Sequence, residues 1–194
     1  YYERDAEILY PPVSVTAYHN KDDNGFYVHL GRLDKEKGIP AVVEAFAGSK
    51  HRLVLAGGQG DISDSVRSKI RRNKNIDYLG FVNESEKFEL LATCRAVVFN
   101  GQNEDFGIVP IEANASGKAV LANEEGFPGL FIEDGVNGLL HDGTPTGIHR
   151  TVERFEQRGV DGDTQEQVEE FSTGTFIQRL ESALTKWHAD FQKA

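Results

Sequence analysis

Short apolar runs alternate with amphipathic segments through most of the chain. Continuously apolar runs such as "RAVVFNG" are typical of strands covered on both faces, and such runs predict strands within residues 26–31, 51–57, 75–82, 95–101, 118–123 and 130–143. Segments such as "NESEKFELLATC" begin like a capping box and then space their apolar residues as a helix does. The same spacing predicts helices within residues 38–49, 61–73, 83–94 and 108–117. This alternation predicts an α/β fold with a parallel sheet and right-handed crossovers.

The two ends of the chain follow other patterns. Residues 1–20 contain Pro11 and Pro12, which stiffen the backbone and remove hydrogen-bond donors, so we expect a lead-in or linker segment there. The domain itself is predicted to cover residues 21–194. From about residue 144 the pattern is entirely helical, and we expect these C-terminal helices to pack on the sheet, with Trp187 as a packing residue.

Composition narrows the class of protein. The 194 residues are 39% hydrophobic and 27% charged, which fits one folded domain rather than a disordered or membrane-spanning chain. A formal net charge of −10 argues against broad nucleic-acid binding, which depends on Lys and Arg at phosphates. The single cysteine, Cys94, precludes a disulfide framework and is expected to be buried. Because the chain begins with Tyr1 and contains no Met, we expect it to be a fragment of a longer protein.

Ligands of open parallel sheets bind beyond the carboxyl ends of the strands, so the loops that follow the strands are the candidate sites. The first loop reads "GRLDKEKGI", in which Gly31 permits close backbone approach while Arg32 and Lys37 offer cations suited to a diphosphate. An alternative is that both cations are solvated and paired with Asp34 or Glu36. The second loop, "LAGGQGDI", lacks a complete dinucleotide or P-loop motif and is interpreted as a tight turn.

The loop after the fourth strand carries the most information. A helix is expected to begin at Ile108 or Val109, which would leave the amide groups from Gly107 onwards as an anion site. Glu104 and Glu112 flank this helix start, and carboxylates accept hydrogen bonds from hydroxyls, so the pattern suggests a ligand with both phosphate and sugar. The alternative is that Glu112 pairs locally and Glu104 is solvated.

Several motifs together resemble one known family. "GRLDKEKG", "LVLAGGQG", "YLGFV", "FGIVPIEANASGKAV" and "DGVNGLL" occur in the order found in retaining glycosyltransferases of family 4, the group 1 glycosyl transferases. The resemblance covers nearly the whole chain. It implies a Rossmann-like three-layer sandwich that forms the C-terminal, donor-binding half of a GT-B fold, with "ILYPPV" as the interdomain segment and extra C-terminal helices. The N-terminal acceptor domain would then lie outside this chain.

The resemblance also implies roles for individual residues. Glu104 and Glu112 fall on the family's E-x7-E motif, which implies that Glu104 contacts the transferred sugar and Glu112 the ribose. Arg32 and Lys37 match the family's diphosphate-binding pair. The implied donor-binding residues are Gly31, Arg32, Lys37, Glu104, Asp105, Phe106, Gly107, Ile108, Val109 and Glu112, with Arg32, Lys37 and Glu104 as the catalytic members.

One departure from the family concerns the loop after the fifth strand. The family often has a Gly-Gly-x-x-Glu segment there, whereas this chain reads "EEGFPGLFIEDG", so the Glu position falls on Gly129 or Leu130 and Glu125 replaces a glycine. Contacts from this loop are therefore not carried over from the family.

The function expected from the resemblance is retaining transfer of a sugar from a nucleotide-sugar donor to a glycan, lipid or other acceptor. GDP-mannose is the favoured donor, and UDP-linked sugars stay open. No cofactor or metal is expected, because the six His residues are scattered and none has ligand spacing with carboxylates. Two alternatives are a non-catalytic nucleotide-sugar-binding module and a nucleotide-sugar epimerase of the same architecture. A cytoplasmic location is expected, with peripheral membrane contact through the N-terminal half as a further alternative.

Overall fold

The computed structural model describes residues 7–102 and 104–192. Six parallel strands form one sheet in the order β3-β2-β1-β4-β5-β6. The strands are β1 (Phe26–Leu30), β2 (Arg52–Ala56), β3 (Ile76–Gly80), β4 (Ala96–Phe99), β5 (Val120–Asn123) and β6 (Gly138–His141). The helices are η1 (Val15–Ala17), α1 (Ile39–Phe46), α2 (Asp64–Arg72), α3 (Glu84–Thr93), α4 (Ile108–Ala115), α5 (Pro128–Phe131), α6 (Pro145–Arg158), η2 (Val168–Phe171) and α7 (Thr173–Phe191). The predicted Rossmann-like α/β fold is therefore confirmed.

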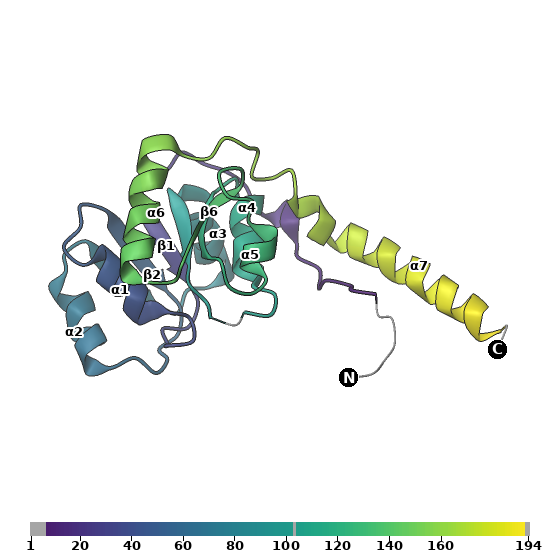
Figure 1. Ribbon diagram of the computed structural model, residues 1–194, viewed down its shortest axis with the longest axis horizontal. Helices are drawn as coiled ribbons and strands as arrows, with labels where there is room; N and C mark the ends of the chain where they lie inside the picture. Colours follow the sequence, from purple (N-terminus) through teal and green to yellow (C-terminus); the bar gives the residue numbers. More distant parts are fainter. Residues whose placement is uncertain (1–6, 103, 193–194) are drawn as a thin grey trace.

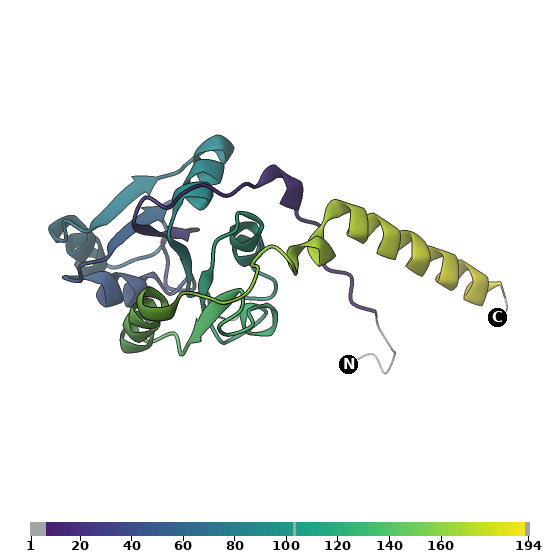
Figure 2. The ribbon, with the colours of Figure 1, turned by 90° about the horizontal axis from the view of Figure 1, so that it is seen from above.

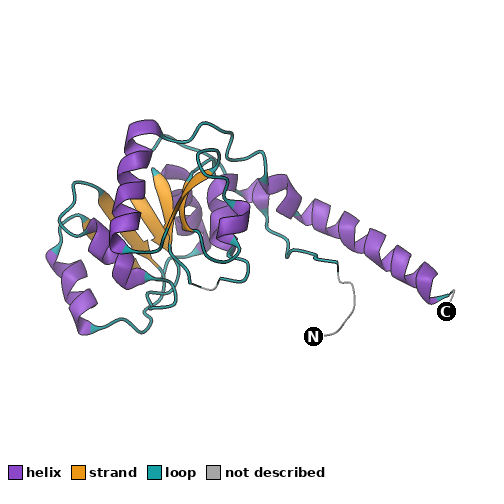
Figure 3. Ribbon diagram, viewed as in Figure 1, coloured by secondary structure: helices purple, strands orange, loops and turns teal. Residues whose placement is uncertain are grey.

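Helices cover both faces of the sheet, and each face has its own hydrophobic core (Figures 1 and 3). Along β1, Tyr27 joins the core beneath α1, α2 and α6, whereas Val28 joins the core beneath α3, α4 and α5. Successive strand side chains point to opposite faces, so a strand buried on both faces must be apolar throughout. This requirement explains the continuously apolar runs in the sequence.

Helix starts agree with the capping residues in the sequence. The Ser63 hydroxyl accepts from the amide of Val66 and begins α2. Asn83 and Glu86 form the predicted capping box at the start of α3, since each side chain accepts from the other residue's amide. Each satisfied amide removes one of the unpaired donors of a helix start, and such a cap contributes about 1 kcal/mol.

The lead-in segment packs against the C-terminal region of the domain. Val13 donates its amide to the carbonyl of Phe171 at 2.8 Å, and Val13 and Val15 are both buried. The segment before η1 thus packs against η2, a contact between residues more than 150 positions apart in the chain. Part of the predicted linker is therefore packed onto the domain.

The C-terminal helices only partly follow the expectation. Helix α6 packs on α1 and on the sheet, and its Ile148 and Val152 are buried, as expected. The expectation is wrong for α7, which projects away from the sheet (Figures 1 and 2). Trp187, on α7, is 51% exposed and does not pack in the core. The apolar spacing predicted a helix correctly, but spacing alone does not say which surface covers the apolar face.

Two histidines are buried in the sheet, at the carboxyl ends of β1 and β6. His29 is 1% exposed and His141 is 4% exposed. Burial disfavours the charged imidazolium, and it lowers the pKa of each side chain from 6.5 to about 4. Both side chains are therefore neutral at pH 7.

These histidines should make the fold sensitive to mild acid. Because the folded-state pKa lies below the unfolded-state value, the unfolded chain binds protons first as the pH falls, and stability is lost from about pH 6.5 towards pH 4. We expect each histidine to account for about 2 kcal/mol of lost unfolding free energy between pH 7 and pH 5.

Urea unfolding at the two pH values measures this loss in the wild type, His29→Gln and His141→Gln. Each substitution should reduce the pH dependence, whereas His149→Gln, at an exposed position of α6, should leave it unchanged. Equal pH dependence in all four proteins would contradict the assignment.

Candidate functional site

The strand order reverses between β1 and β4, where the loops after these two strands diverge. A pocket of about 430 Å³ lies at this point. It is lined by Pro11, Leu30, Gly31, Lys37, Phe99, Glu104, Asp105, Phe106, Gly107, Ile108 and Val109. Eight of the ten predicted donor-binding residues are thus in one pocket, and Arg32 and Glu112 are the two outside it.

An ion pair between Lys37 and Glu104 joins the two loops of this pocket. Both side chains are largely shielded, at 26% and 21% exposure. The Lys37 amide donates to Asp34 at 2.8 Å, which fixes the turn that carries the lysine. On the other side, the Glu104 carbonyl accepts from the amide of Phe127 at 3.1 Å. The pair therefore lies between two loops that are each held by their own backbone contacts.

Helix α4 begins inside the pocket. Its N-cap is Gly107, with a φ of 70°, a backbone conformation that favours glycine. No side chain of the described residues caps this start, and Ile108 and Val109 line the pocket. The unpaired amides and the helix dipole give the position a partial positive charge. The start of α4 agrees with the sequence prediction and is suited to an anionic group.

Arg32 lies just outside the lining. Its side chain is 65% exposed, and its guanidinium lies 3.4 Å from Asp34 and 3.7 Å from Glu36. These are the two carboxylates that the alternative interpretation of the sequence named. Pairs this exposed are worth little, about 0–1 kcal/mol, so they do not hold the arginine strongly in place.

Glu112 occupies a neighbouring pocket of about 400 Å³, which shares Ile108 with the first. The Glu112 side chain is only 9% exposed. Its Oε1 accepts from the Tyr18 hydroxyl at 2.6 Å and from the Lys87 ammonium at 2.8 Å. Both contacts use the same oxygen, so among the described residues Oε2 has no hydrogen-bond partner. The carboxylate is thus oriented, with one oxygen available to a ligand.

The Tyr18 hydroxyl stays protonated and donates its hydrogen bond to Glu112. Burial and the hydrogen bond to Glu112 raise the pKa of its hydroxyl well above the usual value. The sequence offered no signal for this contact, because Tyr18 lies in the predicted lead-in, 94 residues before Glu112.

His29 was also missed by the sequence analysis. Its Nδ1 lies 3.2 Å from the carbonyl of Val98, which can only accept, so Nδ1 carries the proton. Its Nε2 has no hydrogen-bond partner among the described residues, and a Cβ at Gly31 would lie 3.5 Å from it. A neutral imidazole therefore lies next to the backbone of Gly31, where the first loop begins. The available signal was a polar residue inside the apolar run "FYVHLG".

The aromatic side chain of Phe106 anchors the acidic loop. It stacks on Tyr10 with ring centroids 5.6 Å apart and lies 4.6 Å from Phe127. Phe127 belongs to the loop that departs from the family pattern. In that loop a Cβ at Gly126 would lie 2.6 Å from the Glu104 carbonyl, and Leu130 is 84% exposed. The departing loop thus packs against the backbone of Glu104.

In the described ranges, no group of three or more His, Cys, Asp or Glu side chains could hold a metal ion. None of the helices described is long and apolar enough to cross a bilayer. The expectation that no metal is needed stays a prediction.

Solved structures share the fold of this chain. A structure of Anabaena Alr3699/HepE in complex with UDP and glucose superimposes with a TM-score of 0.79 at 22% identity, covering 93% of this chain and 57% of that one. The C-terminal domain of a group 1 family glycosyl transferase (LpcC) from Francisella tularensis has a TM-score of 0.66 at 20% identity, covering 82% of this chain and 93% of that domain. These similarities show a common fold.

Sequence comparison gives the family. Human alpha-1,3/1,6-mannosyltransferase ALG2 is 24% identical over 94% of this chain and 53% of its own length, so the chain spans about half of that relative. An uncharacterized glycosyltransferase of Methanocaldococcus jannaschii, MJ1607, is 31% identical over 69% of the chain and 36% of its own length. The family model described as "Glycosyl transferases group 1" matches residues 16–174. With a match over most of its length, the chain belongs to the group 1 glycosyl transferases.

Proposed function

We propose that this chain is the donor-binding half of a retaining glycosyltransferase and binds a nucleotide-diphosphate sugar. The observation that carries the proposal is the meeting of Lys37, Glu104 and the uncapped start of α4 in one pocket at the strand-order reversal. A cation and helix amides suit a diphosphate, and a carboxylate suits sugar hydroxyls. One pocket thus offers the chemistry for both parts of such a donor.

The proposed donor spans both pockets. Its diphosphate lies against the start of α4, near Gly107, with Lys37 as the neighbouring cation. Glu104 accepts from the hydroxyls of the transferred sugar. Glu112 accepts from the ribose hydroxyls through Oε2, which leaves its bonds to Tyr18 and Lys87 intact. Ile108 lines both pockets, so the two parts of the site are adjacent.

The same groups serve the proposed reaction. As the bond between sugar and diphosphate breaks, negative charge develops on the departing nucleoside diphosphate. Lys37 and the amides of α4 are already in place to stabilise that charge. Arg32 contributes once its guanidinium turns away from Asp34 and Glu36, which are weak partners at this exposure. Charge stabilisation of this kind needs no metal ion.

The similarity to proteins named mannosyltransferases supports GDP-mannose as the donor. The similarity to a structure that holds UDP supports a nucleotide donor in general. We propose that the acceptor, a glycan or lipid, binds to an N-terminal domain of the same protein, and that transfer takes place in the cytoplasm. Product analysis of the whole protein separates transfer from the epimerase and binding-module alternatives.

Lys37 provides the first test. Titration calorimetry of the chain with GDP, UDP, ADP and their sugar conjugates should identify at least one ligand. Lys37→Gln should weaken its binding tenfold or more, because a charge-assisted hydrogen bond contributes about 1.5–3 kcal/mol. Lys35→Gln is the matched control, since Lys35 is exposed in the same loop but does not line the pocket. If the folded chain bound none of these ligands at millimolar concentration, the donor-site proposal would be wrong.

Glu112 provides an independent test of the ribose position. The wild-type chain should prefer the ordinary nucleoside diphosphate about tenfold over its 2′,3′-dideoxy analogue, because the carboxylate accepts from the ribose hydroxyls. Glu112→Gln should lose this preference while it binds the dideoxy analogue about as well as the wild type does. If the variant kept the full preference for the ordinary nucleoside diphosphate, the assignment of Glu112 to the ribose would be wrong. Circular dichroism checks that the variant is folded.

A further inference from the structure

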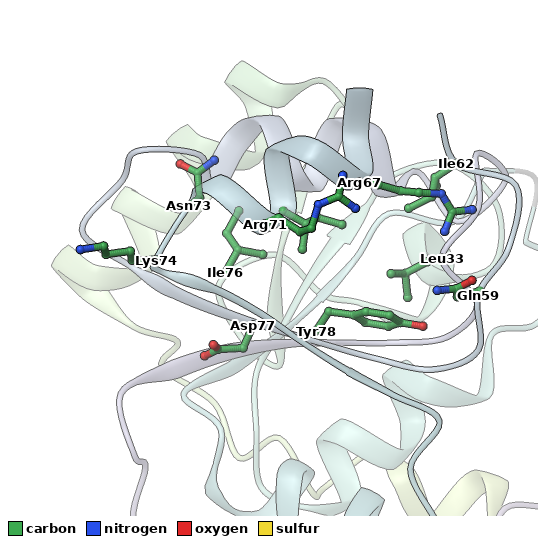
Figure 4. A pocket seen from close by; sticks show the side chains of 11 residues that line it. Leu33, Gln59, Ile62, Arg67, Arg71, Asn73, Lys74, Ile76, Asp77 and Tyr78 are labelled. Atoms are coloured by element: carbon green, nitrogen blue, oxygen red, sulfur yellow. The ribbon is translucent and has the colours of Figure 1, made fainter. Parts of the chain in front are cut away.

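Another pocket, separate from the two of the proposed donor site, lies at the β3 edge of the sheet, between α2 and β3 (Figure 4). Its volume is about 500 Å³, within the range typical of small-molecule sites. It shares no lining residue with either pocket of the proposed donor site. A ligand here would therefore be separate from the nucleotide-sugar.

The interior of this pocket is apolar. Leu33, Ile62, Ile70 and Ile76 all line it, and each of these side chains is less than 9% exposed. The ring of Tyr78 also lines the pocket beneath α2 (Figure 4). The Tyr78 hydroxyl already donates to the carbonyl of Gly57 at 3.1 Å, so the ring offers a ligand its apolar surface.

Cations line one side of this apolar interior. Arg67, Arg71 and Lys74 line the pocket from α2 and the turn after it. Five of the eight residues from Arg67 to Lys74 are Lys or Arg, although the chain as a whole carries −10. Lys69 is paired with Glu44, and Arg67 donates to the carbonyl of Gly60 at 3.3 Å. In the part of the chain that the structure describes, Arg71 and Lys74 form no ion pair.

One carboxylate, Asp77, also lines the pocket, and its charge is balanced. Its Oδ2 accepts from the Arg52 guanidinium at 2.8 Å. The local charge that remains is positive. Unpaired cations beside an apolar interior match a ligand with a negative head and an apolar body, because each part of the ligand then meets its own complement.

We propose that this pocket binds an amphipathic organic phosphate. Its phosphate pairs with Arg71 and Lys74, and its apolar body lies on Ile70, Ile76 and the Tyr78 ring. A soluble alkyl phosphate and the headgroup region of a phosphatidate lipid share this chemistry. A nucleic acid fits less well, since the interior is a concave apolar cavity and the whole chain is acidic.

Hexyl phosphate is the probe for the test, by titration calorimetry with the chain. It should bind saturably and at least tenfold more tightly than inorganic phosphate, because the hexyl group reaches the apolar interior. It should also bind more tightly than 1-hexanol, which lacks the charge. Equal affinity for hexyl phosphate and inorganic phosphate would overturn the proposal, as would the absence of saturable binding.

Substitutions locate the site. Arg71→Gln and Lys74→Gln should each weaken hexyl phosphate binding about fivefold, a typical effect for a partly exposed ion pair. Arg72→Gln is the matched control, since Arg72 is the next residue of the same helix and does not line the pocket. An equal loss in Arg72→Gln would indicate a general charge effect and overturn the assignment. Nucleotide binding by all three variants should be unchanged.

Vesicles distinguish the two sources of the ligand. Binding to phosphatidylcholine vesicles that contain phosphatidate, lost in Arg71→Gln but not in Arg72→Gln, would assign the pocket to the lipid. Binding of hexyl phosphate alone would assign it to a soluble phosphate, and both results uphold the site. Vesicle binding without any hexyl phosphate binding would indicate adsorption on the basic surface and would contradict the pocket.

Discussion

The parallel pairing of β1 with both β2 and β4 is the constraint on which the rest of the molecule depends. Parallel strands joined by right-handed crossovers place all their carboxyl ends at one edge of the sheet. When the chain leaves β3 at one edge and re-enters as β4 beside β1, the direction of strand addition reverses. The loops after β1 and β4 then diverge, and the pocket between them is lined by Gly31 from the first loop and by the start of α4.

The residues that line this pocket are positioned by contacts with elements that are distant in the sequence. Glu104 is fixed through the amide of Phe127, and the Phe106 ring packs against both Tyr10 of the lead-in and Phe127. Glu112 is oriented by Tyr18 from the lead-in and by Lys87 from α3. The lead-in is therefore part of the support of the site as well as a connection. Shared support of this kind fixes the relative positions of the two carboxylates.

Strands, caps and the start of α4 could be predicted because each depends on residues close in sequence, as Asn83 and Glu86 show. The family motifs and the parallel-sheet rule implied that Lys37 and Glu104 belong to one site, but their ion pair was not predicted. For Arg32 the sequence left two alternatives open, and the structure has the exposed one, with Asp34 and Glu36 as partners. The Tyr18 contact and the direction of α7 could not be predicted. They depend on side-chain conformation and tertiary packing, which periodicity does not encode. The α2–β3 pocket was missed for the same reason.

Charge balance explains how so acidic a chain can offer a site to an anion. Each carboxylate of the E-x7-E motif is compensated by a lysine from another element, Glu104 by Lys37 and Glu112 by Lys87. With these two charges offset, the start of α4 adds a partial positive charge between them, beside the carboxylate of Asp105, which also lines the pocket. In the donor complex that we propose, the phosphate lies at this helix start and also competes with Glu104 for Lys37. In the same proposed complex, a sugar hydroxyl donates to the Glu104 carboxylate that Lys37 has released, so phosphate and sugar binding would support each other.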